Sequence, residues 1–192
     1  MRRAAVMLAA VALAASASAA RAAEWKLVPA ESSLHFVGIK NDAVGVVGSF
    51  TTLDGAFDPD KGTGWVEVKI ASANTGDPAR DTNITTHFFE VAKFPTARFE
   101  VSGLPKASKL ADSDVELTGT LKLHGASLPL KIAAHVSRDA HGHLHAHNAK
   151  PVVLSAHDLG MDDQLAALKA VCGHQSLSAA IPIDFDVSFA KP

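Results

Sequence analysis

Alternation of apolar and polar residues is the dominant pattern along the chain, and it predicts strands that bury one face. The pattern is clearest near the C-terminus, where five apolar residues occupy every second position between Ile181 and Phe189. Because side chains on a strand point alternately to opposite sides, each such segment would turn its apolar residues inward. Further segments with this pattern, or the start of it, lie at residues 34–36, 50–57, 66–70, 99–101, 117–123 and 128–136.

Short turn-forming sequences separate the predicted strands. They are the segments 58–62, 102–105, 124–125 and 139–142, which are rich in Gly, Pro, Asp and His. Connections this short favour antiparallel hairpins, because parallel strands need longer crossovers. About eight strands fit into the chain, and a sheet of that size can close into a barrel with room for side chains or one ligand. We therefore predict an all-β, antiparallel β-barrel of about eight strands.

Two segments depart from the alternation and predict one or two short helices. Residues 77–94 are interpreted as one or two helical turns, because Pro78 suits the first turn of a helix. Residues 162–173 predict a longer helix, with Asp162 as its N-terminal cap and Gly173 as its end. No internal repeat or change in composition indicates a second folded domain.

The first 22 residues have the layout of a cleavable secretory signal. Arg2 and Arg3 form a basic head, an apolar run follows from Val6 to Ala15, and residues 20–22 read Ala-Arg-Ala. The apolar run is too short to span a bilayer. We predict a signal peptide over residues 1–22, one domain over residues 23–192, and export to the periplasm.

The charge of the chain argues against nucleic acid as a partner. The formal net charge is −2, and it becomes −5 once the three arginines of the predicted signal are removed. A nucleic-acid-binding surface would require a basic patch or stripe, and the sequence has none. The ten histidines would gain positive charge below a pH of about 6.5. A transient, pH-dependent contact with a membrane is therefore a hypothesis, and a homodimer is left open.

Several motifs in a fixed order resemble those of the YceI-like family of bacterial secreted proteins. The resemblance extends from about residue 24 to residue 190 and rests mainly on the segments 80–81, 87–90, 94–95, 117–125 and 156–161. It implies a lipocalin-like antiparallel barrel that is periplasmic or secreted and carries a long apolar molecule. Polyisoprenoids, isoprenoid quinones and fatty acid derivatives are the ligands described for the family, and no catalytic activity is established for it as a whole.

The chain departs from the family pattern in places, among them Lys40-Asn41 after the first strand and the helix predicted at residues 162–173. Many members have an arginine before an Asp-Phe-Gly-like sequence, whereas residues 156–160 of this chain read Ala-His-Asp-Leu-Gly. The resemblance is therefore to a divergent branch, and the ligand need not be the typical one.

Large apolar residues that could form the wall of the barrel interior, together with one arginine, are the candidate ligand-binding residues. For each apolar residue, ordinary core packing explains its position as well as ligand contact does. The arginine would either face a ligand head group or, with Asp81, tie down the helical segment, and the second interpretation is favoured. The candidates are Phe36, Phe50, Arg80, Phe88, Phe89, Phe99, Leu121 and Phe185.

A tract of histidines provides a second candidate site. His141, His143, His145 and His147 occupy every second position and would share one face of a strand, with about 6–7 Å between successive Cα atoms. Two imidazoles can reach one metal ion, and His135 could add a third across a hairpin. No cysteine or carboxylate is expected to complete a tight set. A solvated polar face is favoured, and the alternative function is periplasmic binding or buffering of Zn, Cu or Ni.

Motifs of common enzyme classes are missing from the sequence. It has no Gly-x-Ser-x-Gly, His-Glu-x-x-His, phosphate-binding loop or Cys-x-x-Cys. The single cysteine, Cys172, can form no disulfide within the chain. We therefore predict a binding protein without a cofactor. An enzyme acting on a bound lipid is the weaker alternative, because no nucleophile or base is identifiable.

Overall fold

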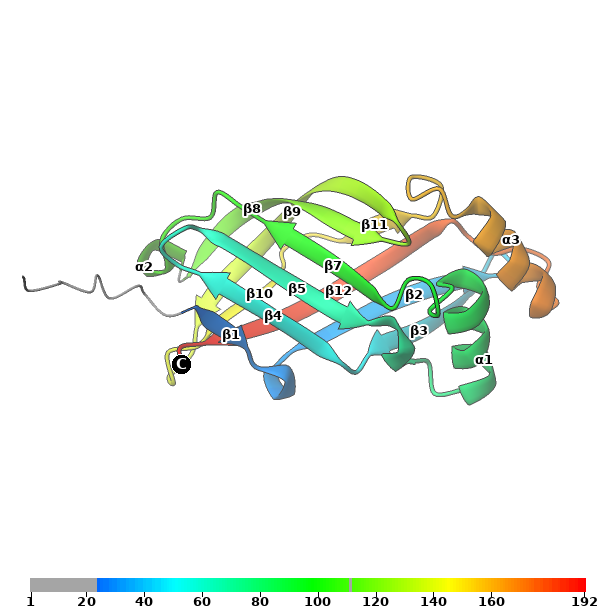
Figure 1. Ribbon diagram of the computed structural model, residues 1–192, viewed down its shortest axis with the longest axis horizontal. Coiled ribbons are helices and arrows are strands. Elements are labelled where there is room, and N and C mark those ends of the chain that lie inside the picture. Colours follow the sequence, from blue (N-terminus) through cyan, green and yellow to red (C-terminus); the bar gives the residue numbers. More distant parts are fainter. Residues whose placement is uncertain (1–23, 111) are drawn as a thin grey trace, which may run out of the picture.

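The computed structural model describes residues 24–110 and 112–192, so the predicted signal peptide lies outside the described residues. One antiparallel sheet closes on itself to form a barrel, with short helices at its ends (Figure 1). The strands are β1 (Trp25–Leu27), β2 (Ser33–Lys40), β3 (Val44–Phe50), β4 (Leu53–Asp58), β5 (Thr63–Lys69), β6 (Ala73–Asn74), β7 (Thr96–Val101), β8 (Ser113–Leu123), β9 (Ala126–Arg138), β10 (Leu144–Asn148), β11 (Val152–Ser155) and β12 (Ala180–Ala190). The helices are η1 (Pro29–Glu31), η2 (Ile70–Ser72), α1 (Pro78–Asn83), η3 (Ile84–Phe88), α2 (Ala107–Leu110) and α3 (Asp162–Val171).

Bends and interruptions arrange these segments into eight positions around the barrel. The predicted strand at residues 50–57 is broken at residues 51–52, so that β3 and β4 are two halves of one bent strand. The short helix η2 separates β5 from β6 in the same way. Along β12, β1 and β2 pair with one edge, whereas β10 and β11 pair with the other. The structure confirms the predicted antiparallel barrel of about eight strands.

The barrel closes through β1, which pairs with both β4 and β12. Lys26 lies opposite Ala56 of β4 and opposite Ala190 of β12. The inward faces of the strands then form a core of apolar side chains, as the alternation predicts. A smaller cluster under α2 contains Trp25 and Phe57, whose rings meet edge to face with centroids 6.3 Å apart.

The helices α1, η3 and α3 gather at the end of the barrel opposite α2 (Figure 1). Asp77 caps α1, because its Oδ1 accepts hydrogen bonds from the backbone N–H groups of Ala79 and Arg80, at 3.0 and 3.2 Å. The predicted cap of the second helix is wrong. Asp162 is the first residue of α3, and its carboxylate pairs with the imidazole of His157 instead of capping the helix.

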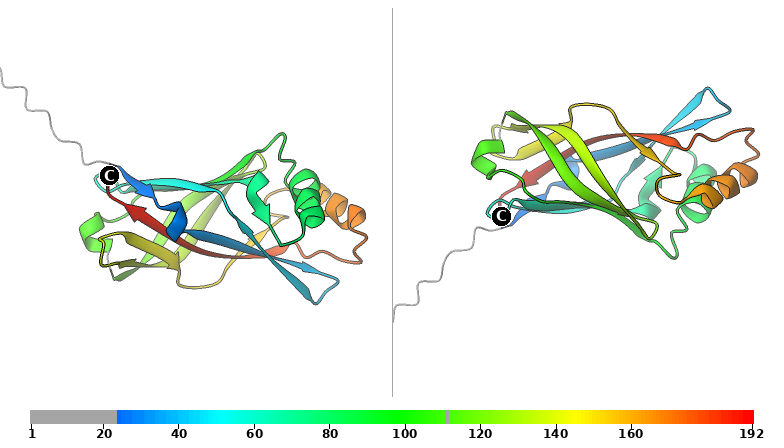
Figure 2. Two further views of the ribbon diagram at one scale, coloured as in Figure 1. Left: turned by 90° about the horizontal axis from the view of Figure 1, so that it is seen from below. Right: turned by 90° about the horizontal axis from the view of Figure 1, so that it is seen from above.

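The β2–β3 hairpin projects past the barrel at this same end (Figure 2). It lies beside the segment that connects α3 to β12, where the carbonyl oxygen of Ile39 accepts a hydrogen bond from the backbone N–H of Ser178 at 2.8 Å. Val44 and Val47 on the hairpin are exposed. The hairpin therefore continues one wall of the barrel alongside the helices that cover this end.

Glu90 connects the elements that cover this end. Its Oε2 accepts a hydrogen bond from Gln164 Nε2 of α3 at 3.0 Å and lies 2.9 Å from His124 Nε2 of the β8–β9 turn. Lys93 also donates to the carboxylate, and the hydrogen bonds from Lys93, Gln164 and His124 lower the pKa of Glu90 from 4.5 to about 2. The ionised carboxylate therefore holds α3 and the turn together.

This depressed pKa predicts an acid-sensitive end cover. Because the folded-state pKa of Glu90 lies below its ordinary value of 4.5, its stabilising contribution is present above pH 4.5 and is lost as the pH falls towards about 2. We expect Glu90→Gln to be less stable than the wild type at pH 7 and to approach it at low pH. Urea unfolding at a series of pH values measures this. Glu24→Gln is the control, because Glu24 forms only an exposed ion pair with Lys26. Its unfolding free energy should stay close to that of the wild type. A difference for Glu90→Gln that stays constant down to the lowest pH would contradict the assignment.

A glycine on β8 permits a close approach between neighbouring strands. A Cβ atom at Gly119 would lie 2.3 Å from the carbonyl oxygen of Glu100 and 2.6 Å from the ring of Phe99. Gly38, on β2, has no atom within 4 Å of the equivalent position. A side chain at Gly119 would therefore clash with the neighbouring strand, whereas a side chain at Gly38 would enter open space, although both glycines interrupt an apolar face.

We expect Gly119→Ala to destabilise the barrel by about 1–3 kcal/mol, because the backbone oxygen cannot move away without disturbing β7. Gly38→Ala is the matched control and should change the stability by less than about 0.5 kcal/mol. Urea unfolding of lipid-free protein measures both. Equal effects of the two substitutions would show that close packing at Gly119 is unimportant.

Candidate functional site

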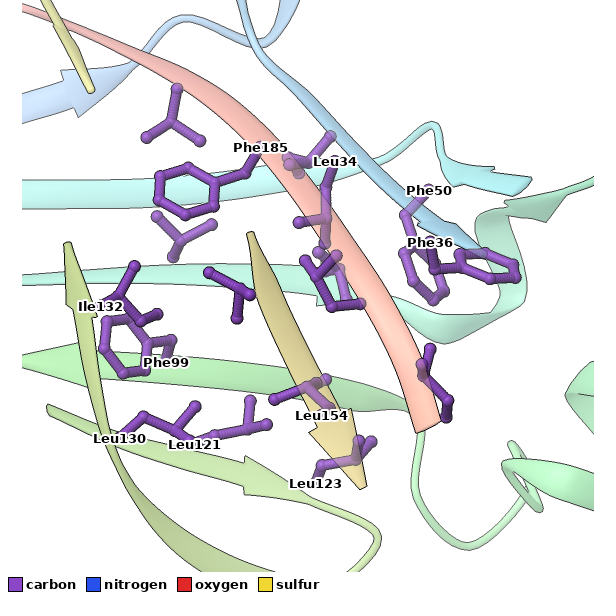
Figure 3. Close-up of a pocket in the computed structure, with 18 of the residues that line it drawn as sticks. Leu34, Phe36, Phe50, Phe99, Leu121, Leu123, Leu130, Ile132, Leu154 and Phe185 are labelled. Atoms are coloured by element: carbon purple, nitrogen blue, oxygen red, sulfur yellow. The ribbon is translucent and has the colours of Figure 1, made fainter. Parts of the chain in front are cut away.

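The barrel encloses a cavity of about 310 Å³ (Figure 3). That volume falls in the range of small-molecule binding sites. Leu104 and Leu110 line it at the α2 end, whereas Ile84, Leu165 and Leu168 line it at the end covered by α3. The cavity therefore runs along the barrel and suits an elongated ligand better than a compact one.

All seven apolar candidates from the sequence line this cavity. Figure 3 shows that Phe99 and Leu121 lie at one side of the view, and that Phe36 and Phe50 lie together at the other. The ring of Phe50 also packs against Phe89, with centroids 6.0 Å apart. Their contact with a ligand stays a prediction. The seven are Phe36, Phe50, Phe88, Phe89, Phe99, Leu121 and Phe185.

Other lining residues were not among the candidates. Leu34, Leu130 and Ile132 belong to the same alternating strands and could have been found from that pattern. Leu154 of β11 and Leu168 of α3 could not have been found from it, because the position of these elements depends on the tertiary structure.

The lining is apolar almost throughout. Among the described residues that line the cavity, none is charged, and only Ser178 and Trp65 have a polar side-chain N or O atom. Gly38 also faces the cavity and leaves space there. A ligand would thus be held by burial of apolar surface, because the cavity provides no ionic partner for it.

Arg80 is not among the residues that line the cavity. Its Nη2 lies 3.3 Å from Asp77 Oδ2, and its Nη1 donates to the carbonyl oxygen of Thr75 at 3.5 Å. Asp81 accepts hydrogen bonds from the backbone N–H and the hydroxyl of Thr75, at 2.8 and 2.6 Å. Arg80 and Asp81 therefore tie α1 to the segment before it.

The structure divides the histidine tract among different surroundings. His147 lies opposite His135 across the β9–β10 ladder, with ring centroids 5.4 Å apart. His141 lies in the turn before β10, with its ring 6.1 Å from that of His143. His143 and His145 approach carboxylates, and so does His135, whose Nδ1 lies 2.8 Å from Asp114 Oδ1. The predicted single row of histidines on one strand is therefore only partly present.

The expectation that no carboxylate completes a tight set with the histidines is wrong, because Glu31 and Asp139 lie close to His143. His143 Nδ1 is 2.9 Å from Glu31 Oε2, and His145 Nε2 is 3.4 Å from Asp139 Oδ2. Glu31 precedes His143 by 112 residues in the sequence. Only the barrel, which places η1 beside β10 and β12, brings these groups together.

No helix among the described residues is both long enough and apolar enough to cross a membrane.

This chain is similar to a number of known proteins. A UPF0312 protein of Azotobacter vinelandii is 32% identical over 117 residues, which is 56% of this chain. The match spans 59% of that relative's length. The solved structure of a polyisoprenoid binding domain from Saccharophagus degradans, implicated in plant cell wall breakdown, has a TM-score of 0.80 and 24% identity and covers 88% of this chain and 98% of that one. BcnA of Burkholderia cenocepacia has a TM-score of 0.66 at 16% identity, over 84% of this chain and 98% of that one.

The two solved structures show that the barrel fold is shared. The family model described as the YceI-like domain matches residues 25–189, which is nearly all of the part of the chain that forms the barrel. This chain belongs to the YceI-like family.

Proposed function

We propose that this protein binds and carries a long apolar molecule inside its barrel. The observation that carries the proposal is the elongated cavity, whose lining contains no charged residue among those described. Burial is worth about 0.8 kcal/mol for each CH2 group, so a chain of about ten carbons supplies ample affinity without polar contacts. Polyisoprenoids, isoprenoid quinones and fatty acid derivatives all satisfy this requirement.

The character of the lining favours a neutral ligand. An ionised carboxylate placed in this cavity would lose its hydration and find no cation in return, which is a large unfavourable term. A free fatty acid would therefore have to keep its head group at one end. A polyisoprenoid or quinone chain meets no such restriction, and the Saccharophagus degradans neighbour is described as a polyisoprenoid binding domain.

The predicted signal peptide supports a place for this function in the periplasm. A carrier there would collect and deliver its ligand at a membrane, and transient membrane contact is part of the proposal. The cavity offers no arrangement of nucleophile and base among its described lining residues, so the proposal is one of binding and not of catalysis.

Protein purified from its own host should contain an extractable lipid in a ratio approaching one per chain. Native mass spectrometry followed by organic extraction measures this and identifies the ligand. The proposal fails if the protein contains no lipid and if lipid-free protein also does not bind a long-chain polyprenol or quinone.

Filling the cavity should weaken binding without unfolding the barrel. Gly38→Leu places a side chain where no atom lies within 4 Å of the new Cβ atom. If the ligand loses burial of about two CH2 groups, affinity for a labelled polyprenol falls about tenfold.

Gly45→Leu is the matched control, because Gly45 lies on the same hairpin but is exposed, and a Cβ atom there would contact only Val37 at 3.7 Å. It should bind the polyprenol as the wild type does. Unchanged affinity in Gly38→Leu, or an equal loss in both variants, would place the ligand elsewhere.

A further inference from the structure

Two histidines and two carboxylates converge outside the barrel. Glu31 ends η1, Asp139 belongs to the turn between β9 and β10, and His143 and His145 lie just before and within β10. Leu144, between the two histidines, is buried and lines the cavity, so its neighbours face outward. The turn lies at the end of the barrel away from α3 (Figure 1).

Three groups of this cluster lie close enough together to hold one metal ion. Ligand atoms of Glu31, Asp139 and His143 all lie within 4.8 Å of one another. His143 Nδ1 is 2.9 Å from Glu31 Oε2 and 3.6 Å from Asp139 Oδ2. His145 Nε2 is 3.4 Å from Asp139 Oδ2 and 4.0 Å from Glu31 Oε2.

These separations can be compared with those of a tetrahedral zinc site. Zinc binds histidine nitrogen and carboxylate oxygen at about 2.0–2.2 Å, which puts neighbouring ligand atoms about 3.4 Å apart. The four observed distances lie on both sides of this value. Small rotations of the side chains would therefore bring Glu31, Asp139 and His143 to one ion. His145, whose Nε2 lies within 4.0 Å of both carboxylates, is the candidate for the fourth ligand.

The cluster also has the outer hydrogen bonds that orient metal ligands. Asp139 Oδ1 accepts the backbone N–H groups of His141 and His143, at 2.9 and 2.8 Å, which leaves Oδ2 to face the histidines. The buried Ser188 donates to Glu31 Oε2 at 2.8 Å. The other ring nitrogen of His145, Nδ1, faces a carboxylate oxygen of Asp186 at 3.9 Å, which is beyond hydrogen-bond distance. Such outer partners hold the ligating groups in place before the ion arrives.

The charge of the cluster suits a divalent cation. Glu31 and Asp139 are carboxylic acids, and the ordinary pKa of such groups, about 4, leaves them ionised at neutral pH. The four side chains are between 23% and 37% exposed, so an ion can enter from solvent.

We propose that Glu31, Asp139, His143 and His145 form a binding site for a divalent first-row transition metal such as Zn²⁺. The mixed nitrogen and oxygen ligands match that class, whereas Mg²⁺ and Ca²⁺ prefer sites built from oxygen alone. The site is on the outer surface and does not depend on the apolar cavity. The competing account is a cluster of histidinium–carboxylate ion pairs that binds no metal.

Calorimetric titration of Zn²⁺ into the untagged, chelator-treated protein tests the proposal. We expect one ion per chain, with no comparable binding of Mg²⁺. His143→Gln combined with His145→Gln should weaken Zn²⁺ binding by at least about 100-fold, because half of the ligands are lost. Ser188→Ala keeps all four ligands but removes an orienting hydrogen bond, and should weaken binding by about tenfold.

The matched control is His135→Gln combined with His147→Gln, which removes the same number of histidines from the neighbouring outward pair. It should bind Zn²⁺ as the wild type does, and lipid content should be unchanged in every variant. The proposal is overturned if the wild type binds no Zn²⁺ at micromolar concentrations. It is also overturned if the His143/His145 variant binds as the wild type does, or if the control variant loses the site.

Discussion

Closure of the sheet is the constraint on which the rest of this structure depends. The short strand β1 pairs with β4 on one side and with β12 on the other, so the ring of strands has no open edge there. Backbone hydrogen bonds are then satisfied between neighbours around the ring, and no exposed edge remains at this point to pair with another chain. Closure also turns every second side chain of each strand towards a common interior. The apolar residues of each alternating segment thereby form one shared interior.

That interior is only partly filled by its own side chains. Phe36, Phe50 and Phe89 pack closely near the end covered by η3, and Trp25 packs with Phe57 under α2. Between these clusters the leucine, isoleucine and valine side chains of opposite walls leave the cavity open. A closed eight-stranded barrel can be filled by its own side chains or can hold one ligand, and the size of the inward-facing side chains decides between the two.

One strand contributes to both proposed sites. On β10, Leu144 and Ala146 line the cavity, whereas His145 faces outward towards Asp139. The apolar and the charged residues are separated because neighbouring side chains on a strand point to opposite faces of the sheet. The wall of the barrel therefore keeps an apolar ligand and a charged cluster a single strand's thickness apart, so that changes to one need not affect the other.

Local pattern was sufficient for the longer strands, such as β8, β9 and β12, and for most of their inward faces, whereas it did not predict β1 or β11. Five of the seven apolar candidates that line the cavity lie on strands and follow from the same spacing, whereas Phe88 and Phe89 lie at the end of η3. The YceI-like motifs agreed with this pattern. The break within residues 50–57 and the position of Asp162 inside α3 were predicted wrongly, because bends and caps depend on a few local contacts that periodicity does not describe.

The partners of the histidines could not be predicted for a different reason. Glu31 and His143 are 112 residues apart, and their 2.9 Å contact exists only because β12 places η1 beside β10. Sequence by itself determined which residues of the alternating strands face inward, since that depends on a two-residue period. Tertiary structure alone decided which outward groups meet and whether the interior stays open, since both depend on how distant segments close into one barrel.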